Sequence, residues 1–190
     1  IKDYFLRGHK ETQRFIWEIN SQSMYYRQQI SEVMFNLLDS HDTERILTTA
    51  KGDLQSVKSA LAFLYLQRGT PCIYYGTELA LIGGPDPDCR RCMPWERVSS
   101  DNDMLNFMKR LIKIRKHASE IISHGKYSLQ EIKQDVVALE WTYEGRVLKA
   151  TFNQSKEDYL LEKETVALAS NCQESENQLV ISPKGFVIFH

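Results

Sequence analysis

The first 118 residues show an apolar pattern that predicts helices separated by short strands. Residues 10–30 carry apolar side chains at mixed helical spacing, which predicts one long helix or two short ones. The apolar run Val33–Leu38 predicts a buried strand. Asp53 precedes an apolar stripe at Leu54, Val57, Leu61 and Leu64 and is the predicted N-cap of a helix. A second buried strand is predicted at Cys72–Tyr75, followed by a helix with an apolar face formed by Met104, Phe107, Met108, Leu111, Ile112 and Ile114.

Beyond residue 118 the pattern changes to short β-prone runs separated by turn residues such as Glu144-Gly145 and Pro183-Lys184-Gly185. The runs recur about every ten residues, which is typical of a small antiparallel β-sandwich. We therefore expect two domains, an α/β segment at residues 1–118 and an all-β domain at residues 119–190. The predicted strands are Lys126–Ile132, Val136–Thr142, Val147–Phe152, Tyr159–Leu161, Thr165–Leu168, Leu179–Ile181 and Phe186–Phe189.

Strands that alternate with helices favour a parallel sheet, with functional loops at the carboxyl ends of the strands. The segments Asp39–Arg45 and Gly76–Arg97 are two such loops. Two strands are too few for a parallel sheet with both faces covered, so we expect further strands upstream. The chain starts with Ile1 rather than Met, which fits the same expectation.

Composition and charge are those of an ordinary soluble globular protein, with 42% hydrophobic and 26% charged residues. The net charge of −1 comes from 24 basic and 25 acidic residues without long blocks of either sign. This balance argues against a nucleic acid or an anionic membrane as partner. No apolar stretch approaches the roughly 20 residues needed to span a bilayer.

Two short polar motifs are candidates for chemistry. His41-Asp42 follows the apolar run Val33–Leu38, so both side chains are expected at the rim of a sheet where they can meet a polar ligand. Cys89 and Cys92 have a CxxC spacing, but no second Cys/His pair completes a zinc site. The pair also lies in a Gly/Pro-rich loop rather than at the start of a helix, so reduced loop thiols are favoured over redox chemistry.

Three motifs in order resemble the α-amylase family of glycoside hydrolases. Residues 34–45, Met-Phe-Asn-Leu-Leu-Asp-Ser-His-Asp-Thr-Glu-Arg, resemble the last conserved sequence region of that family. Residues 69–78, Gly-Thr-Pro-Cys-Ile-Tyr-Tyr-Gly-Thr-Glu, resemble its eighth barrel strand and the following turn. The loop at residues 83–95 is most similar to the neopullulanase, cyclomaltodextrinase and maltogenic amylase branch.

The resemblance implies the C-terminal part of a (β/α)8 barrel, about strands 7 and 8 with helices 6 to 8, followed by a C-terminal antiparallel β domain. The parent would be a retaining α-glucan hydrolase or transglycosylase that acts on α-1,4- or α-1,6-glucosidic bonds of pullulan, cyclodextrins or maltodextrins. Such enzymes use a carboxylate nucleophile, a carboxylic acid and a third acid. The sequence contains no Arg-x-Asp nucleophile motif, and the glutamates near its start lie in helix-like sequence. We therefore expect this chain to be inactive alone.

By resemblance, Asp42 is the third catalytic acid, and it and His41 hydrogen-bond the sugar in the subsite before the scissile bond. Asp86 and Arg90 match positions that bind a glucose further from the cleavage point, although a loop salt bridge without a ligand role is an equal alternative. The branch resembled implies a cytoplasmic location. No cofactor is expected, and calcium in the parent stays open because no acidic ligand cluster is evident here. The barrel edge at Val33–Leu38 is expected to template self-association.

Two other functions compete with this one. His41-Asp42 is also the dyad of a metal-dependent phosphohydrolase group, for which His9 and Asp53 would be the partner ligands. That reading leaves the motif at residues 69–78 unexplained. The β domain is alternatively a non-catalytic carbohydrate-binding module, which needs aromatic side chains on one exposed sheet face. Most aromatic residues there are expected in the core instead, namely Tyr127, Trp141, Tyr143, Phe152, Tyr159, Phe186 and Phe189.

Overall fold

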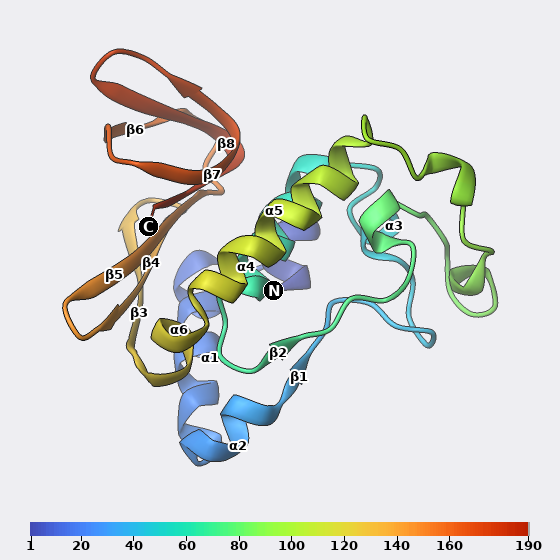
Figure 1. The fold of residues 1–190 in the computed structure, drawn as a ribbon, viewed down its shortest axis with the longest axis horizontal. Helices are drawn as coiled ribbons and strands as arrows, with labels where there is room; N and C mark the ends of the chain where they lie inside the picture. The colour runs from blue at the N-terminus through green and yellow to red at the C-terminus, as the bar shows by residue number, and fades with distance from the viewer. Residues whose placement is uncertain (190) are drawn as a thin grey trace.

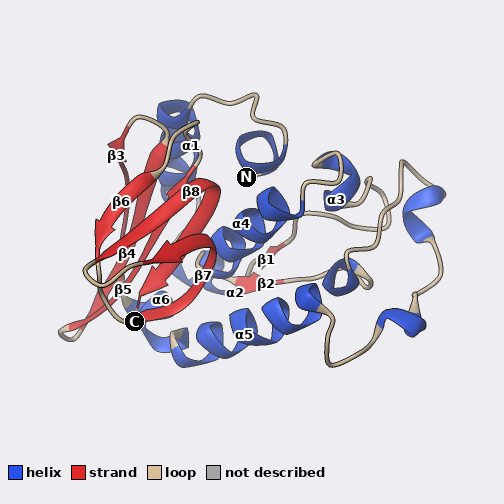
Figure 2. Ribbon diagram, turned by 90° about the horizontal axis from the view of Figure 1, so that it is seen from above, coloured by secondary structure: helices blue, strands red, loops and turns tan. Residues whose placement is uncertain are grey.

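In the computed structural model, helices pack against one face of an antiparallel sheet, and a long looped region extends away from it (Figures 1 and 2). The structure describes residues 1–189, apart from the side chain of Ser23. None of the helices within this range has both the length and the apolar character to cross a membrane.

The first part of the chain is mainly helical, and residues 10–30 form two helices rather than one. The short β-strands β1 and β2 lie between helices, and three short helical turns follow β2. The elements are η1 (Lys2–Leu6), α1 (Thr12–Tyr25), α2 (Gln28–Val33), β1 (Phe35–Asn36), α3 (Ile46–Thr49), α4 (Leu54–Tyr65), β2 (Thr70–Pro71), η2 (Thr77–Leu79), η3 (Asp88–Arg90), η4 (Trp95–Arg97), α5 (Asp103–His117) and α6 (Ser119–His124).

The two predicted buried strands are largely wrong in length and in burial. β1 and β2 pair in parallel, as predicted, but over two residues each. Val33 and Phe35 are 74% and 71% exposed. Residues 72–75 are not in a strand, and Cys72 is exposed. A parallel strand is buried when strands flank it and helices cover it, and no third strand joins this sheet within residues 1–189.

Helix α4 is the centre of the core. The predicted N-cap is confirmed, because the Asp53 carboxylate accepts hydrogen bonds from the backbone N–H groups of Gln55 and Ser56. Its Phe63 ring lies 5.2 to 5.5 Å from the rings of Phe5, Phe15 and Phe152, centroid to centroid. These contacts join η1, α1 and the sheet around one helix.

The second part of the chain forms one hydrogen-bonded sheet of six strands in the order β3-β4-β5-β8-β6, with β7 also paired to β8. All its pairings are antiparallel, as predicted. The strands are β3 (Lys126–Lys133), β4 (Val136–Tyr143), β5 (Arg146–Asn153), β6 (Tyr159–Glu162), β7 (Val166–Glu174) and β8 (Gln178–Phe189).

Strand β8 replaces the last two predicted strands and connects the two halves of the sheet. Its first half pairs with β6 and its second half with β5, while β7 pairs along both. Gly185 lies between the halves, where a Cβ atom would approach the carbonyl oxygens of Asn171 and Ser182 to 2.5 and 2.8 Å. Because a side chain has no space there, glycine permits the close backbone approach.

The sheet encloses apolar side chains on both of its faces. Trp141, Phe152 and Phe186 are buried on the side of the helices, and Trp141 donates its Nε1–H to the carbonyl oxygen of Leu66 at 2.8 Å. A smaller cluster contains Leu179, Ile181, Val187 and Phe189, from the two halves of β8. The boundary at residues 118 and 119 stays a prediction; the first strand of the sheet begins at Lys126.

Candidate functional site

The His41-Asp42 pair lies in the loop between β1 and α3, and the buried residue Asp39 fixes the start of that loop. The Asp39 carboxylate accepts hydrogen bonds from Ile46 N–H and Thr77 Oγ1, both at 3.1 Å to Oδ2. Burial raises the pKa of this carboxyl, and the bonds from Ile46 and Thr77 oppose the increase. Asp39 thus ties the loop to α3 and to η2, while the following residues remain at the surface.

All four predicted site residues come together at the surface. His41 Nε2 lies 3.3 Å from Asp42 Oδ2, and Arg90 Nη2 lies 3.9 Å from Asp42 Oδ1. Arg90 Nε lies 2.9 Å from Asp86 Oδ1 and also donates to the carbonyl oxygen of His41 at 3.2 Å. The four side chains are 47 to 70% exposed. They therefore form one solvent-accessible group from two separate loops.

This group combines hydrogen-bond donors and acceptors. The carboxylates of Asp42 and Asp86 accept, the guanidinium of Arg90 donates, and a neutral imidazole at His41 does both. Adjacent hydroxyl groups on a sugar need such a mixture, and a guanidinium next to carboxylates orients several hydroxyls at once. Asp86 and Arg90 form the loop salt bridge, which is one of the two alternatives for this pair.

Arg45 organises the loops around this group, although the sequence alone predicts no role for it. Arg45 is fully buried, and its Nε donates to the carbonyl oxygen of Cys89 at 2.7 Å while Nη1 donates to that of Tyr75. Its Cζ lies 4.0 Å from the ring centroid of Tyr74 and 4.6 Å from that of Tyr75. The only signal in the sequence was its position three residues after Asp42, and a charge in a polar loop does not predict burial.

Aromatic side chains lie on and next to the long loop. Trp95, in the η4 turn, is 72% exposed. Tyr74 and Tyr75 cover the Arg45 guanidinium, and Tyr75 Oη donates to the carbonyl oxygen of Arg91 at 2.7 Å. These tyrosines therefore help to hold the loop against Arg45.

The cysteines of the CxxC spacing have different environments. Cys89 is buried and its Sγ–H donates to the carbonyl oxygen of His41 at 3.1 Å, whereas Cys92 is exposed; both are free thiols. Within residues 1–189, no three His, Cys, Asp or Glu side chains are arranged to hold a metal ion. Asp53, which the phosphohydrolase alternative requires as a ligand, instead caps α4 and pairs with Lys184.

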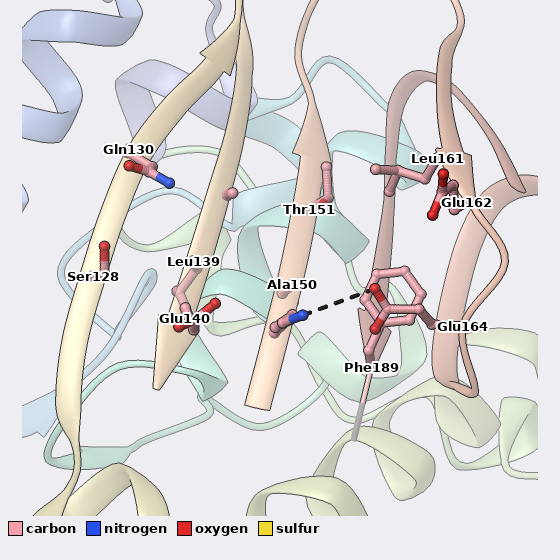
Figure 3. Close-up of a pocket in the computed structure, with 12 residues that line it drawn as sticks. Ser128, Gln130, Leu139, Glu140, Ala150, Thr151, Leu161, Glu162, Glu164 and Phe189 are labelled. Atoms are coloured by element: carbon pink, nitrogen blue, oxygen red, sulfur yellow. Dashed lines mark ion pairs between the residues drawn. The ribbon is translucent and has the colours of Figure 1, made fainter. Parts of the chain in front are cut away.

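Within residues 119–189, the β domain has a cavity but no exposed aromatic face of the kind that a carbohydrate-binding module needs. Trp141, Phe152, Phe186 and Phe189 are buried, which confirms their predicted place in the core. A cavity of about 390 Å³ lies on the outer face of the sheet, lined by residues of β3, β4, β5 and β6 (Figure 3). An ion pair between Lys149 and Glu164 crosses it at 3.8 Å. None of the four predicted site residues lines this cavity.

Residues 7–115 match the family model described as the α-amylase catalytic domain. The chain is 42% identical over 154 residues to an intracellular maltogenic amylase from Bacillus subtilis, which covers 80% of the chain and 26% of that protein. It is 37% identical over 131 residues to neopullulanase 2 from Thermoactinomyces vulgaris, over 69% of the chain and 22% of that protein.

Among solved structures, a cyclomaltodextrinase superposes with a TM-score of 0.80 at 31% identity, covering 98% of the chain and 34% of the cyclomaltodextrinase. The chain therefore spans about a quarter to a third of the length of these relatives.

Proposed function

Because the chain belongs to the α-amylase family, we propose that it is the C-terminal part of a retaining α-glucan hydrolase or transglycosylase. The proposed substrates are pullulan, cyclodextrins or short maltodextrins, in line with the names of its relatives. The observation that supports this proposal best is the grouping of His41, Asp42, Asp86 and Arg90. The four residues come from two loops, and Asp42 and Asp86 are 44 residues apart in the sequence.

In the proposed mechanism, Asp42 and His41 hold the hydroxyls of the sugar on the non-reducing side of the scissile bond. Their hydrogen bonds strengthen as the ring distorts toward the oxocarbenium-like transition state. Asp86 and Arg90 hold a more distant glucose. The nucleophile and the general acid would come from the remainder of the parent, so residues 1–190 alone are proposed to be inactive. We propose a cytoplasmic location for the parent.

The role of Asp42 is tested in the full-length parent by Asp42→Asn, which preserves size and removes the charge. We expect turnover of a maltooligosaccharide to fall by about 100-fold or more, as for loss of a group that stabilises transition-state charge. Asp101→Asn is a matched control, because Asp101 is an exposed aspartate that bonds only to Ser100 within the described residues. Equal turnover in Asp42→Asn and in the unsubstituted enzyme would refute the assignment.

The inactivity of residues 1–190 is tested with a chromogenic maltoside and the purified chain. We expect no release of chromophore above that of a chain carrying Asp42→Asn. Turnover that disappears in the Asp42→Asn chain would show that the described residues suffice for catalysis, and would contradict the proposal.

We also propose that the isolated chain self-associates through the barrel edge at Val33–Leu38. This segment exposes the large apolar side chains Val33, Phe35 and Leu37, and β1 has a free edge in its two-stranded sheet. Exposed apolar strand edges pair readily with another chain. Light scattering after gel filtration should give a mass above 22.1 kDa that falls on dilution; a monomer at all concentrations would contradict this.

A further inference from the structure

Arg45 connects three segments that are distant in the sequence. Its backbone N–H donates to the carbonyl oxygen of Gly83 at 3.0 Å. Its guanidinium donates to the carbonyl oxygens of Tyr75 and Cys89. The side chain is fully buried. A single residue close to His41-Asp42 thus contacts the turn after β2 at Tyr75 and the long loop at two points, Gly83 before Asp86 and Cys89 next to Arg90.

Cys89, which accepts a hydrogen bond from Arg45, also contacts the predicted site. Cys89 and Arg90 both donate to the carbonyl oxygen of His41, through Sγ at 3.1 Å and Nε at 3.2 Å. The Arg90 guanidinium then lies between Asp42 and Asp86. Since Arg90 is half exposed and exposed ion pairs contribute little by themselves, its position depends on the backbone at Cys89, which Arg45 holds.

We propose that Arg45 is a positioning residue: its buried guanidinium fixes the Gly83–Cys92 loop against the His41-Asp42 loop and so sets the distance between the two halves of the sugar site. The consequence for the sugar rests on the proposed function; the docking of the loop does not.

Arginine is suited to this position and lysine is not. The guanidinium is planar, donates in two directions at once and stacks on the rings of Tyr74 and Tyr75. A lysine ammonium is a compact point charge and lacks the planar fork that donates to two carbonyl oxygens while it stacks on the rings. The remaining guanidinium nitrogen of Arg45, Nη2, is buried without a hydrogen-bond partner among the described residues, which costs free energy.

The thiol of Cys89 reports on loop docking in the chain itself. In the unsubstituted chain it is buried, so iodoacetamide should modify Cys72 and Cys92 quickly and Cys89 slowly. In Arg45→Met, we expect the modification rate of Cys89, measured by peptide mass spectrometry, to rise at least about tenfold, equivalent to about 1.4 kcal/mol of easier loop opening. Arg45→Lys should give a smaller increase.

Arg115→Met is the matched control. Arg115 is a partly buried arginine, and its guanidinium likewise donates to backbone carbonyl oxygens, those of Tyr65, Gln67 and Gly69, away from the site. A smaller increase for Arg45→Met than expected, or an equal increase in Arg115→Met, overturns the proposal. Circular dichroism establishes folding; if neither Arg45 variant folds, Arg45 is a global stabiliser and the proposal is also overturned.

The effect on the site is measured in the full-length parent with Arg45→Lys. We expect kcat/KM to fall at least about fivefold more for a maltooligosaccharide long enough to reach Asp86 and Arg90 than for one too short, about the net contribution of one ordinary hydrogen bond. An equal loss for both lengths would indicate a merely structural role. A parent without α-glucan activity would refute the proposed function, while the Cys89 rates would still decide the docking role of Arg45.

Discussion

Strands β1 and β5 both come from apolar runs, yet one is exposed and the other is buried. In β5 the side chains of Leu148, Ala150 and Phe152 are at most 1% exposed. β5 is hydrogen-bonded to β4 on one side and β8 on the other, and helices cover its inner face (Figure 2). β1 has one partner strand of two residues. Burial therefore follows from neighbouring strands and a covering layer, which an apolar run by itself does not supply.

Truncation of a buried side chain in β5 should have the largest effect. Phe152→Ala removes a fully buried ring that contacts the rings of Phe5, Phe63 and Phe186. We expect the free energy of unfolding to fall by about 3–5 kcal/mol, from lost apolar burial and the cavity left behind. Urea denaturation followed by tryptophan fluorescence measures it.

Leu160→Ala is the control for this truncation, because Leu160 lies in β6 of the same sheet and is exposed. It should change the free energy of unfolding by no more than about 0.5 kcal/mol. A loss below about 1 kcal/mol in Phe152→Ala would mean that the sheet and the helices do not share one core.

The sequence predicted most of the helices and the antiparallel sheet because those elements carry their own signals. Asp53 caps α4, and the apolar face of α5 places Met104, Phe107 and Leu111 in the core. Ile112, which was predicted on the same face, is 39% exposed. The continuity of β8 was not predicted, since Pro183 and Gly185 are ordinary turn signals. In the structure the strand continues through them, because β7 pairs along both halves of β8.

The site could be predicted only as separate residues. Motifs pointed to His41, Asp42, Asp86 and Arg90, and the structure places them together, but their roles with a sugar remain predictions. The part played by Arg45 could not be predicted, because it depends on the backbone carbonyl oxygens of Tyr75 and Cys89. Local sequence does not reveal which carbonyl groups a folded loop leaves without partners.

An intermediate effect on the free energy of unfolding is expected where the helical region contacts the antiparallel sheet. Asp53 caps α4 and also pairs with Lys184 of β8. Asp53→Ala should lower the free energy of unfolding at pH 7 by about 1 kcal/mol, the usual contribution of an N-cap. Asp101→Ala is the control and should have little effect, because Asp101 neither caps a helix nor pairs with a cation among the described residues.

The Asp53 contribution should also depend on pH. Partial burial raises the pKa of the carboxyl, but the bonds from Lys184 and Ser56 outweigh it and hold the pKa below its ordinary value. The folded protein therefore binds this proton less readily than the unfolded chain does. The stabilisation is complete above the ordinary pKa of about 4 and is lost as the pH falls through the lower folded pKa. Asp53→Ala should flatten this acid limb of the stability curve; an unchanged limb would contradict the assignment.

The smallest effect on stability is expected at Phe35, and it separates the two regions most clearly. Phe35 is a large apolar residue in a strand, like Phe152, but it is exposed. Phe35→Ser should therefore change the free energy of unfolding of the monomer by no more than about 0.5 kcal/mol. It should lower the apparent mass of the chain in light scattering, because a polar side chain weakens apolar contact along the β1 edge.

Leu160→Ser is the matched control, since it removes an exposed apolar side chain from the other region and should leave the mass unchanged. A large loss of stability in Phe35→Ser would mean that β1 is packed in solution, and the contrast between the two strands would then disappear.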